Sequence, residues 1–180
     1  MKATTDTGIL RFIDDCYIQV GSLAPIQMYI MPDISDGHDA AYNQQTGIGR
    51  SLPAYTFGNG GPRNISWTIH LYADYPERLQ LNLQTLRIIE SCTYPRIGAG
   101  NLPFTPPSIC KIKCGPMLGD YPLAAVLKSY SVSFPTDIMW SERIGNFGPI
   151  PYKFDITCQF EVVYDASQLP GAERILTEGN

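Results

Sequence analysis

The stretch Pro32–Ala73, PDISDGHDAAYNQQTGIGRSLPAYTFGNGGPRNISWTIHLYA, joins a long polar segment to an amphipathic strand. The polar segment covers residues 32–62, is rich in glycine and shows no sustained hydrophobic period, so we predict an irregular loop there. A compact domain rarely keeps about 30 irregular residues unless they reach a ligand or another subunit. Because no catalytic constellation accompanies this segment, contact with a neighbouring subunit is the first hypothesis.

The predicted loop carries side chains that commonly anchor protein interfaces. Aromatic and arginine side chains dominate binding energies at interfaces, because they bury large areas and make several directed contacts. A loop that packs only on its own subunit remains the alternative. The candidate inter-subunit contacts are Tyr42, Arg50, Tyr55 and Phe57.

A half-buried strand is predicted from Asn64 to Ala73, directly after the loop. The run Gly58–Pro62 before it has the composition of a turn, and we expect it to close the loop. Strict alternation of apolar and polar residues follows, which is typical of a strand with one face in the core. The apolar face comprises Ile65, Trp67, Ile69, Leu71 and Ala73, and the polar face comprises Asn64, Ser66, Thr68, His70 and Tyr72.

The period then changes to that of a helix. Asp74 is a candidate N-cap, Pro76 suits the first turn, and Glu77 lies three residues after the cap. We expect the helix to end before Pro95, since the residue before a proline disfavours helical geometry. Its apolar stripe comprises Leu79, Leu83, Leu86 and Ile89.

Several further segments alternate in the same way as the strand at 64–73. Within 108–114 the cysteines and Ile112 are expected to point inward, and within 124–134 Val126 is expected to share a face with Tyr130 and Val132. Long strands with one helix indicate a mainly β fold, a β-sandwich or barrel with a flanking α-helix. We expect one domain over residues 1–180 with a peripheral C-terminal tail at 165–180. The predicted further strands cover 9–20, 26–31, 108–114, 124–134 and 151–164.

Composition narrows the classes of function. Charged residues make up 17% of the chain, apolar residues 44%, and the net charge is −4. A typical soluble domain has about 25% charged residues, so the low share indicates a surface partly covered by partners. The acidic balance gives no basic footprint for nucleic acid. We expect no membrane association, because no apolar run approaches the ~20 residues of a membrane span and the first residues lack a secretory signal's apolar core.

The residues that could support catalysis or metal binding are few. The chain has two histidines, His38 and His70, and no spacing that would join either to a nucleophile. Cys110 and Cys114 are four residues apart on a predicted strand, about 13 Å, which is too far to chelate one metal. We therefore expect no enzyme activity, no metal and no cofactor. The five cysteines are expected to be reduced, buried thiols of a protein assembled in the cytoplasm.

The order of these elements carries a resemblance over residues 24–165. The segments that carry it are Ala40–Tyr42, Gly49–Pro53, Tyr55–Phe57, Arg63–Ser66, the strand and helix that follow, PPSICKIKCG at 106–115, Ser129–Phe134 and Tyr152–Tyr164. In order and spacing they resemble the tail-tube-like proteins of contractile-tailed phage baseplates, in particular the baseplate tail-tube junction protein.

This resemblance implies a structural virion protein rather than an enzyme. Six subunits would form a homohexameric ring, joining their sheets into a hollow barrel through which DNA passes without specific binding. Adjacent tail-tube and baseplate hub rings would be partners, with sheath or wedge proteins as further candidates. The protein would be located in the virion, at the baseplate and tube of the tail, after assembly in the host cytoplasm.

A tube ring also needs a polar strand face toward its lumen. Alternation shows that the predicted strands have two faces without showing which one is buried in the subunit. Asn64, Ser66 and Lys153 belong to the same candidate faces. The lumen-facing candidates are Thr68, His70, Asp155, Thr157, Gln159 and Glu161.

Two other readings of the chain stay open. A monomeric ligand-binding β-barrel would show an apolar internal cavity, and a tube protein of another contractile injection system would form the same ring in a different particle.

Overall fold

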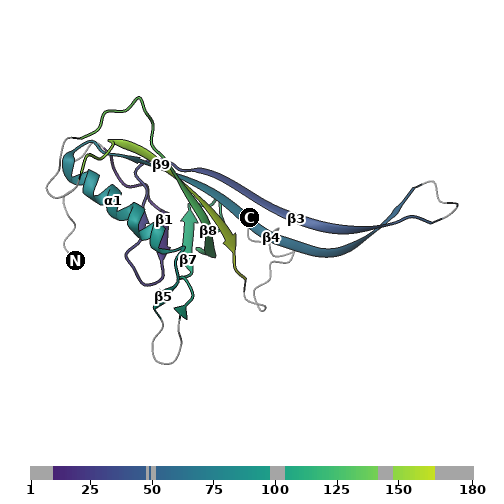
Figure 1. Cartoon of the computed structure of the whole chain (residues 1–180). Coiled ribbons are helices and arrows are strands. Elements are labelled where there is room, and N and C mark those ends of the chain that lie inside the picture. Colours follow the sequence, from purple (N-terminus) through teal and green to yellow (C-terminus); the bar gives the residue numbers. More distant parts are fainter. Residues whose placement is uncertain (1–9, 48, 50–51, 98–103, 142–147, 165–180) are drawn as a thin grey trace.

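The structure is a computed structural model that describes residues 10–47, 49, 52–97, 104–141 and 148–164. These residues form one seven-stranded antiparallel sheet, one two-stranded ribbon and one helix, as Figure 1 shows. The large sheet has the order β2-β1-β7-β8-β9-β4-β3. The elements are β1 (Cys16–Val20), β2 (Ile26–Gln27), β3 (Asp33–Gln45), β4 (Ala54–Tyr72), α1 (Pro76–Ser91), β5 (Arg96–Ile97), β6 (Phe104–Thr105), β7 (Cys110–Cys114), β8 (Leu123–Ser133) and β9 (Lys153–Val162).

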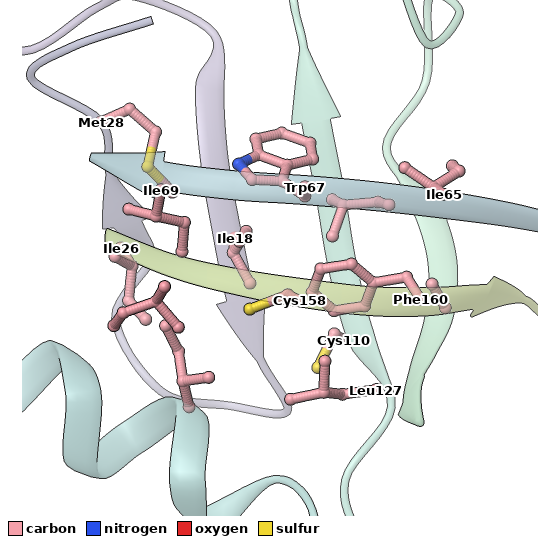
Figure 2. Close-up of a cluster of buried hydrophobic side chains, with 14 of the residues drawn as sticks. Ile18, Ile26, Met28, Ile65, Trp67, Ile69, Cys110, Leu127, Cys158 and Phe160 are labelled. Carbon is pink, nitrogen blue, oxygen red and sulfur yellow. The ribbon is translucent and has the colours of Figure 1, made fainter. Parts of the chain in front are cut away.

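The core lies on the inner face of this single curved sheet. Figure 2 shows side chains of β1 and β7 meeting those of β4 and β9, although β8 and β9 lie between β7 and β4 in the strand order. The helix adds Ile89 to this core. The sheet's terminal strands are β2 and β3, which do not pair with each other, so the sheet is curved but not closed. The mainly β class with one flanking helix is therefore confirmed, as an open single sheet.

Burial follows the alternation read from the sequence. The apolar faces of β4, β7 and β9 are buried, and the central indole, Trp67, is 0% exposed. All five cysteines are buried free thiols, as expected. Ala73, which directly follows β4, is buried as well. The buried apolar residues of β4 are Ile65, Trp67, Ile69 and Leu71.

The helix is confirmed, but its predicted cap is wrong. Tyr75 occupies the N-cap position and makes no capping hydrogen bond with its side chain. Asp74 instead lies 3.3 Å from the guanidinium of Arg78, which is fully buried and also stacks on the Tyr29 ring at 3.9 Å. A buried cation needs a nearby carboxylate more than the helix needs a cap. Leu79 and Ile89 of the predicted stripe are fully buried.

The irregular loop predicted at 32–62 is wrong, because this segment forms most of a long antiparallel hairpin. Strands β3 and β4 pair from Asp33↔Thr68 to Gln45↔Ala54. The run Gly58–Gly61, expected to be a turn, lies within β4. Glycine fits this close strand approach, because a Cβ on Gly61 would lie 3.2 Å from the carbonyl oxygen of Asp39, which is a tight contact.

Two smaller differences between the predicted and the observed strands also come from local backbone geometry. The strand predicted at 9–20 begins only at Cys16, since Asp15 takes a left-handed conformation with φ 57°. In β8 a register shift between Leu127 and Ser129 leaves Lys128 unpaired. Val126 therefore pairs with Glu161 on the polar face, opposite to its predicted side.

Trp67 offers a direct test of the core. Its buried indole Nε1 has no hydrogen-bond partner among the described residues. We expect Trp67→Ala to lower the free energy of unfolding by about 3–5 kcal/mol, because it leaves a large cavity. Trp67→Phe should cost much less, since it keeps a ring and removes the unpaired donor. Urea unfolding of both variants measures this, and equal losses would contradict the assignment of a tightly packed indole site.

Candidate functional site

The hairpin extends beyond the rest of the sheet as an arm, defined here as the described residues of 37–63. Strand β9 pairs with β4 only from Asn64 to Tyr72, so the remainder of β4 has β3 as its neighbour. Figure 1 shows the two strands running together away from the body. No described side chain in the arm is buried. A two-stranded ribbon of this kind has little stability of its own in water.

Three aromatic side chains gather on one face of the arm. Tyr42 and Phe57 are cross-strand partners, and their ring centroids are 5.7 Å apart in an edge-to-face arrangement. Tyr55 shares their face because it lies two residues before Phe57 on β4. The exposed fractions of Tyr42, Tyr55 and Phe57 are 60%, 63% and 63%. Three of the four predicted contact residues are thus brought together, while Arg50 lies outside the described residues.

The arm is also short of charge. Between Ala40 and Pro62 the sequence has one charged residue, Arg50. An exposed segment normally carries charged side chains, which keep it soluble and prevent strand edges from pairing with other chains. Exposed aromatic rings on a ribbon with so few charges are instead characteristic of a surface that another molecule covers.

An ion pair stabilises the base of the arm. The Arg63 Nε donates to both carboxylate oxygens of Asp36, at 2.9 and 3.0 Å, and joins β4 to β3. The hydrogen bond that Arg63 donates to Asp36 is the main factor that raises the pKa of Arg63, and the hydrogen bond with Tyr164 adds to it. Beyond this pair, β3 has register shifts between His38 and Ala40 and between Ala41 and Tyr42. These shifts increase the local twist of the arm.

The close strand approach in the arm can be tested with two glycines. A methyl group on Gly61 would crowd the Asp39 carbonyl, whereas a Cβ on Gly37 would meet nothing within 4 Å. We expect Gly61→Ala to accelerate amide hydrogen exchange in the arm relative to wild type, and Gly37→Ala to leave it unchanged or slower. Hydrogen exchange followed by mass spectrometry measures this. Equal exchange in both variants would show that the crowding has no effect.

The second candidate surface is the outer face of the sheet, opposite the core. Cross-strand partners on β3, β4, β9 and β8 place polar residues in two rows across four strands and one row across three. The predicted lumen candidates all lie on this face. The rows are Ser35, Ser66, Gln159 and Ser129; Asp33, Thr68, Thr157 and Ser131; and His70, Asp155 and Ser133.

Hydrogen bonds join these rows across the strands. The Thr68 and Thr157 hydroxyls are 3.2 Å apart, and the Gln159 amide donates to Ser66 Oγ at 3.0 Å. His70 lies between two carboxylates, with Nδ1 2.8 Å from Asp155 and Nε2 3.2 Å from Asp33. Both ring nitrogens thus have a carboxylate partner, and these contacts fix the orientation of the imidazole on the outer face.

Several charged side chains on this face have hydrogen-bond partners within it. Lys128 donates to Glu161, and His70 contacts both Asp33 and Asp155. What remains exposed is mainly hydroxyl and amide groups. Sequence reasoning missed Asp33 and Ser35 on this face because it assigned them to a loop, although Asp33-Ile34-Ser35 alternates in polarity.

The described residues contain no group of three His, Cys, Asp or Glu side chains that could hold a metal ion. A depression of about 380 Å³ on α1 is lined by Gln80, Leu83, Gln84, Arg87 and Ile88. Arg87 is the only charged side chain in that lining, and its guanidinium already pairs with Glu90 at 2.9 Å. The depression therefore lacks the converging polar groups that orient a small ligand.

No protein-family model matches the chain, and no curated protein matches it either. Among the described residues, no helix has both the length and the apolar character required to cross a membrane.

Proposed function

We propose that the chain is a structural subunit of a contractile phage tail, forming a homohexameric ring at the junction of the baseplate and the tail tube. The ring encloses a channel for DNA. The observation that carries the proposal is the combination of an open sheet, an exposed aromatic arm and a continuous polar face on one subunit.

The open sheet supports assembly. Strand β3 ends the sheet and, within the described residues, has β4 as its only strand partner. Long unpaired edges promote association with other chains, and closure into a ring removes them. Six copies joined edge to edge would form one hollow barrel, larger than any that a single seven-stranded sheet could close.

The arm supports contact between subunits. Tyr42, Tyr55 and Phe57 project from a ribbon that lies beyond its own core, so their rings need an apolar surface elsewhere. A neighbouring copy in the same ring or in the adjacent tube or hub ring supplies that surface. Arg50 belongs to the same contact in this proposal.

The polar face supports the channel. DNA binds proteins mainly through Lys and Arg side chains that neutralise its phosphates. A face of serine, threonine and glutamine with locally paired charges lets a polyanion pass without holding it. The lumen-facing residues are Thr68, His70, Asp155, Thr157, Gln159 and Glu161.

In this proposal the protein belongs to the virion and is assembled in the host cytoplasm. A tube subunit of another contractile injection system would use the same geometry in a particle without DNA. Light scattering of the purified chain at several concentrations, with negative-stain imaging, tests assembly. We expect hexameric rings or stacked tubes, and a monomer at every concentration with no ring in native particles would refute the proposal.

The arm contacts can be tested by removing the rings. We expect Tyr42→Ser, Tyr55→Ser and Phe57→Ser together to abolish ring formation while the melting temperature of the subunit stays within about 2 °C, because surface substitutions rarely change stability much. Tyr121→Ser is the matched control, since Tyr121 is 72% exposed on the body of the subunit. Size-exclusion chromatography measures the ring yield of the triple variant and of the control. A normal ring yield in the triple variant would contradict the role of the arm.

The channel assignment can be tested with a single introduced thiol. All native cysteines are buried, so Thr157→Cys provides the reactive site. In assembled tubes we expect it to react with a small maleimide but not with a maleimide coupled to a protein wider than the lumen. Gln84→Cys on the exposed side of α1 is the control and should react with both. If Thr157→Cys in tubes reacts equally well with the wide reagent, the polar face does not line the channel.

A further inference from the structure

Two cysteines far apart in the chain face each other across β1 and β7. Cys16 is the first residue of β1, Cys114 is the last residue of β7, and the two are register partners. Their Sγ atoms are 3.3 Å apart, inside van der Waals contact, and both residues are 1% exposed. Both thiols are free.

The backbone around this pair has the geometry that a cross-strand disulfide needs. The amide of Gly115 donates to the carbonyl of Asp15 at 2.9 Å, which places Cys16 and Cys114 at a non-hydrogen-bonded position of the antiparallel ladder. At such positions the Cα atoms are about 4.5 Å apart and the side chains are closest. That separation falls within the range of disulfides, about 4.4–6.8 Å. The sulfurs need to move by about 1 Å to bond.

We propose that Cys16 and Cys114 are a redox modification site, a dithiol that closes into a disulfide and ties β1 to β7. The oxidant is a low-molecular-weight disulfide such as oxidised glutathione. The thiolate of one cysteine attacks a glutathione sulfur and releases one reduced glutathione. The second cysteine, as its thiolate, then attacks the mixed disulfide and releases the other. In total, two protein thiols lose two electrons and two protons, and one glutathione disulfide becomes two thiols.

The location of the pair gives the bond a structural effect. Apart from β7, the sheet partner of β1 is the two-residue strand β2, so this end of the sheet has few ladder hydrogen bonds. The cross-link joins residues separated by 98 positions, and closing so long a loop restricts the unfolded chain strongly. The disulfide therefore protects the end of the sheet opposite the arm. The inference is independent of the assembly proposed above.

Burial makes the reaction slow in the intact fold. Burial and the contact with Cys114 raise the pKa of Cys16 to about 12, so the reactive thiolate is rare at neutral pH. Exchange therefore requires transient opening of β1, and the finished bond is equally shielded from reductants. This explains how one sequence could stay reduced in a cell and become cross-linked after prolonged exposure to oxidant.

A second pair of neighbouring thiols could form a disulfide in place of the Cys16–Cys114 bond. The thiols of Cys92 and Cys110 contact each other between the end of α1 and β7, which together with burial raises the pKa of Cys110. Cys92 also donates its thiol to the Ile88 carbonyl at 3.1 Å. These two residues come from a helix end and a strand, so they lack the matched backbone positions of a ladder pair.

The test incubates the folded full-length chain with oxidised glutathione in urea below its unfolding midpoint, then blocks free thiols and maps peptides by mass spectrometry. We expect a Cys16–Cys114 cross-linked peptide, three blocked cysteines, and a melting temperature about 10 °C above that of the reduced protein. Cys16→Ser should lose the cross-link and Cys92→Ser should keep it.

The comparison of oxidised with reduced wild type needs no substitution, so it decides even if a variant fails to fold. Five blocked thiols after oxidation would overturn the proposal, as would a Cys92–Cys110 cross-link in higher yield. A Cys16–Cys114 bond that leaves the melting temperature unchanged would overturn its stabilising role.

Discussion

One strand, β4, is buried in the core along one half and exposed in the arm along the other. The rest of the structure depends on how its residues are divided between these two environments. Its C-terminal half places Trp67 in the core, while its N-terminal half, among the residues that the structure describes, is largely exposed and pairs only with β3. Packing of the Trp67 face fixes the register, because a slip of one residue would expose the indole and bury Thr68. That register places Thr68 beside Thr157. The polar face therefore follows from one packed side chain, whereas the register shifts of β3 between His38 and Tyr42 set the pairing of Tyr42 with Phe57.

The sequence predicted the parts of the fold that have one buried face and missed the part that has none. Alternation marks a strand only when one side is in the core, which holds for 64–73 and for β9. In the arm both faces are exposed, so no alternation is selected and the segment reads as a loop. Its strand partners lie from 9 positions apart, for Gln45 and Ala54, to 25 positions apart, for His38 and Arg63, and short-range patterns cannot reveal such pairing. The polar face was predictable from alternation, whereas the position of the arm was not.

Tertiary contacts also override local signals at single residues. Asp74 has the right type and spacing for a helix cap, yet it lies beside the buried Arg78 guanidinium because an unpaired buried charge costs more than a missing cap. In β8 the unpaired Lys128 moves Val126 to the outer face, and Lys128 in turn reaches Glu161. Neither effect is visible in a hydrophobic pattern, since each depends on a partner brought near by the fold.

The electrostatics of the polar face follow from where its charges are paired. A channel for a polyanion must avoid strong attraction, which would hold it, and strong repulsion, which would exclude it. Asp33 and Asp155 both contact His70, and Glu161 pairs with Lys128, so the Lys128–Glu161 pair offsets part of the negative field of this face locally. In water at physiological salt the remainder is screened within about 8 Å. In the channel proposed above, the hydroxyl and amide rows between these pairs are the groups that a passing polyanion would contact.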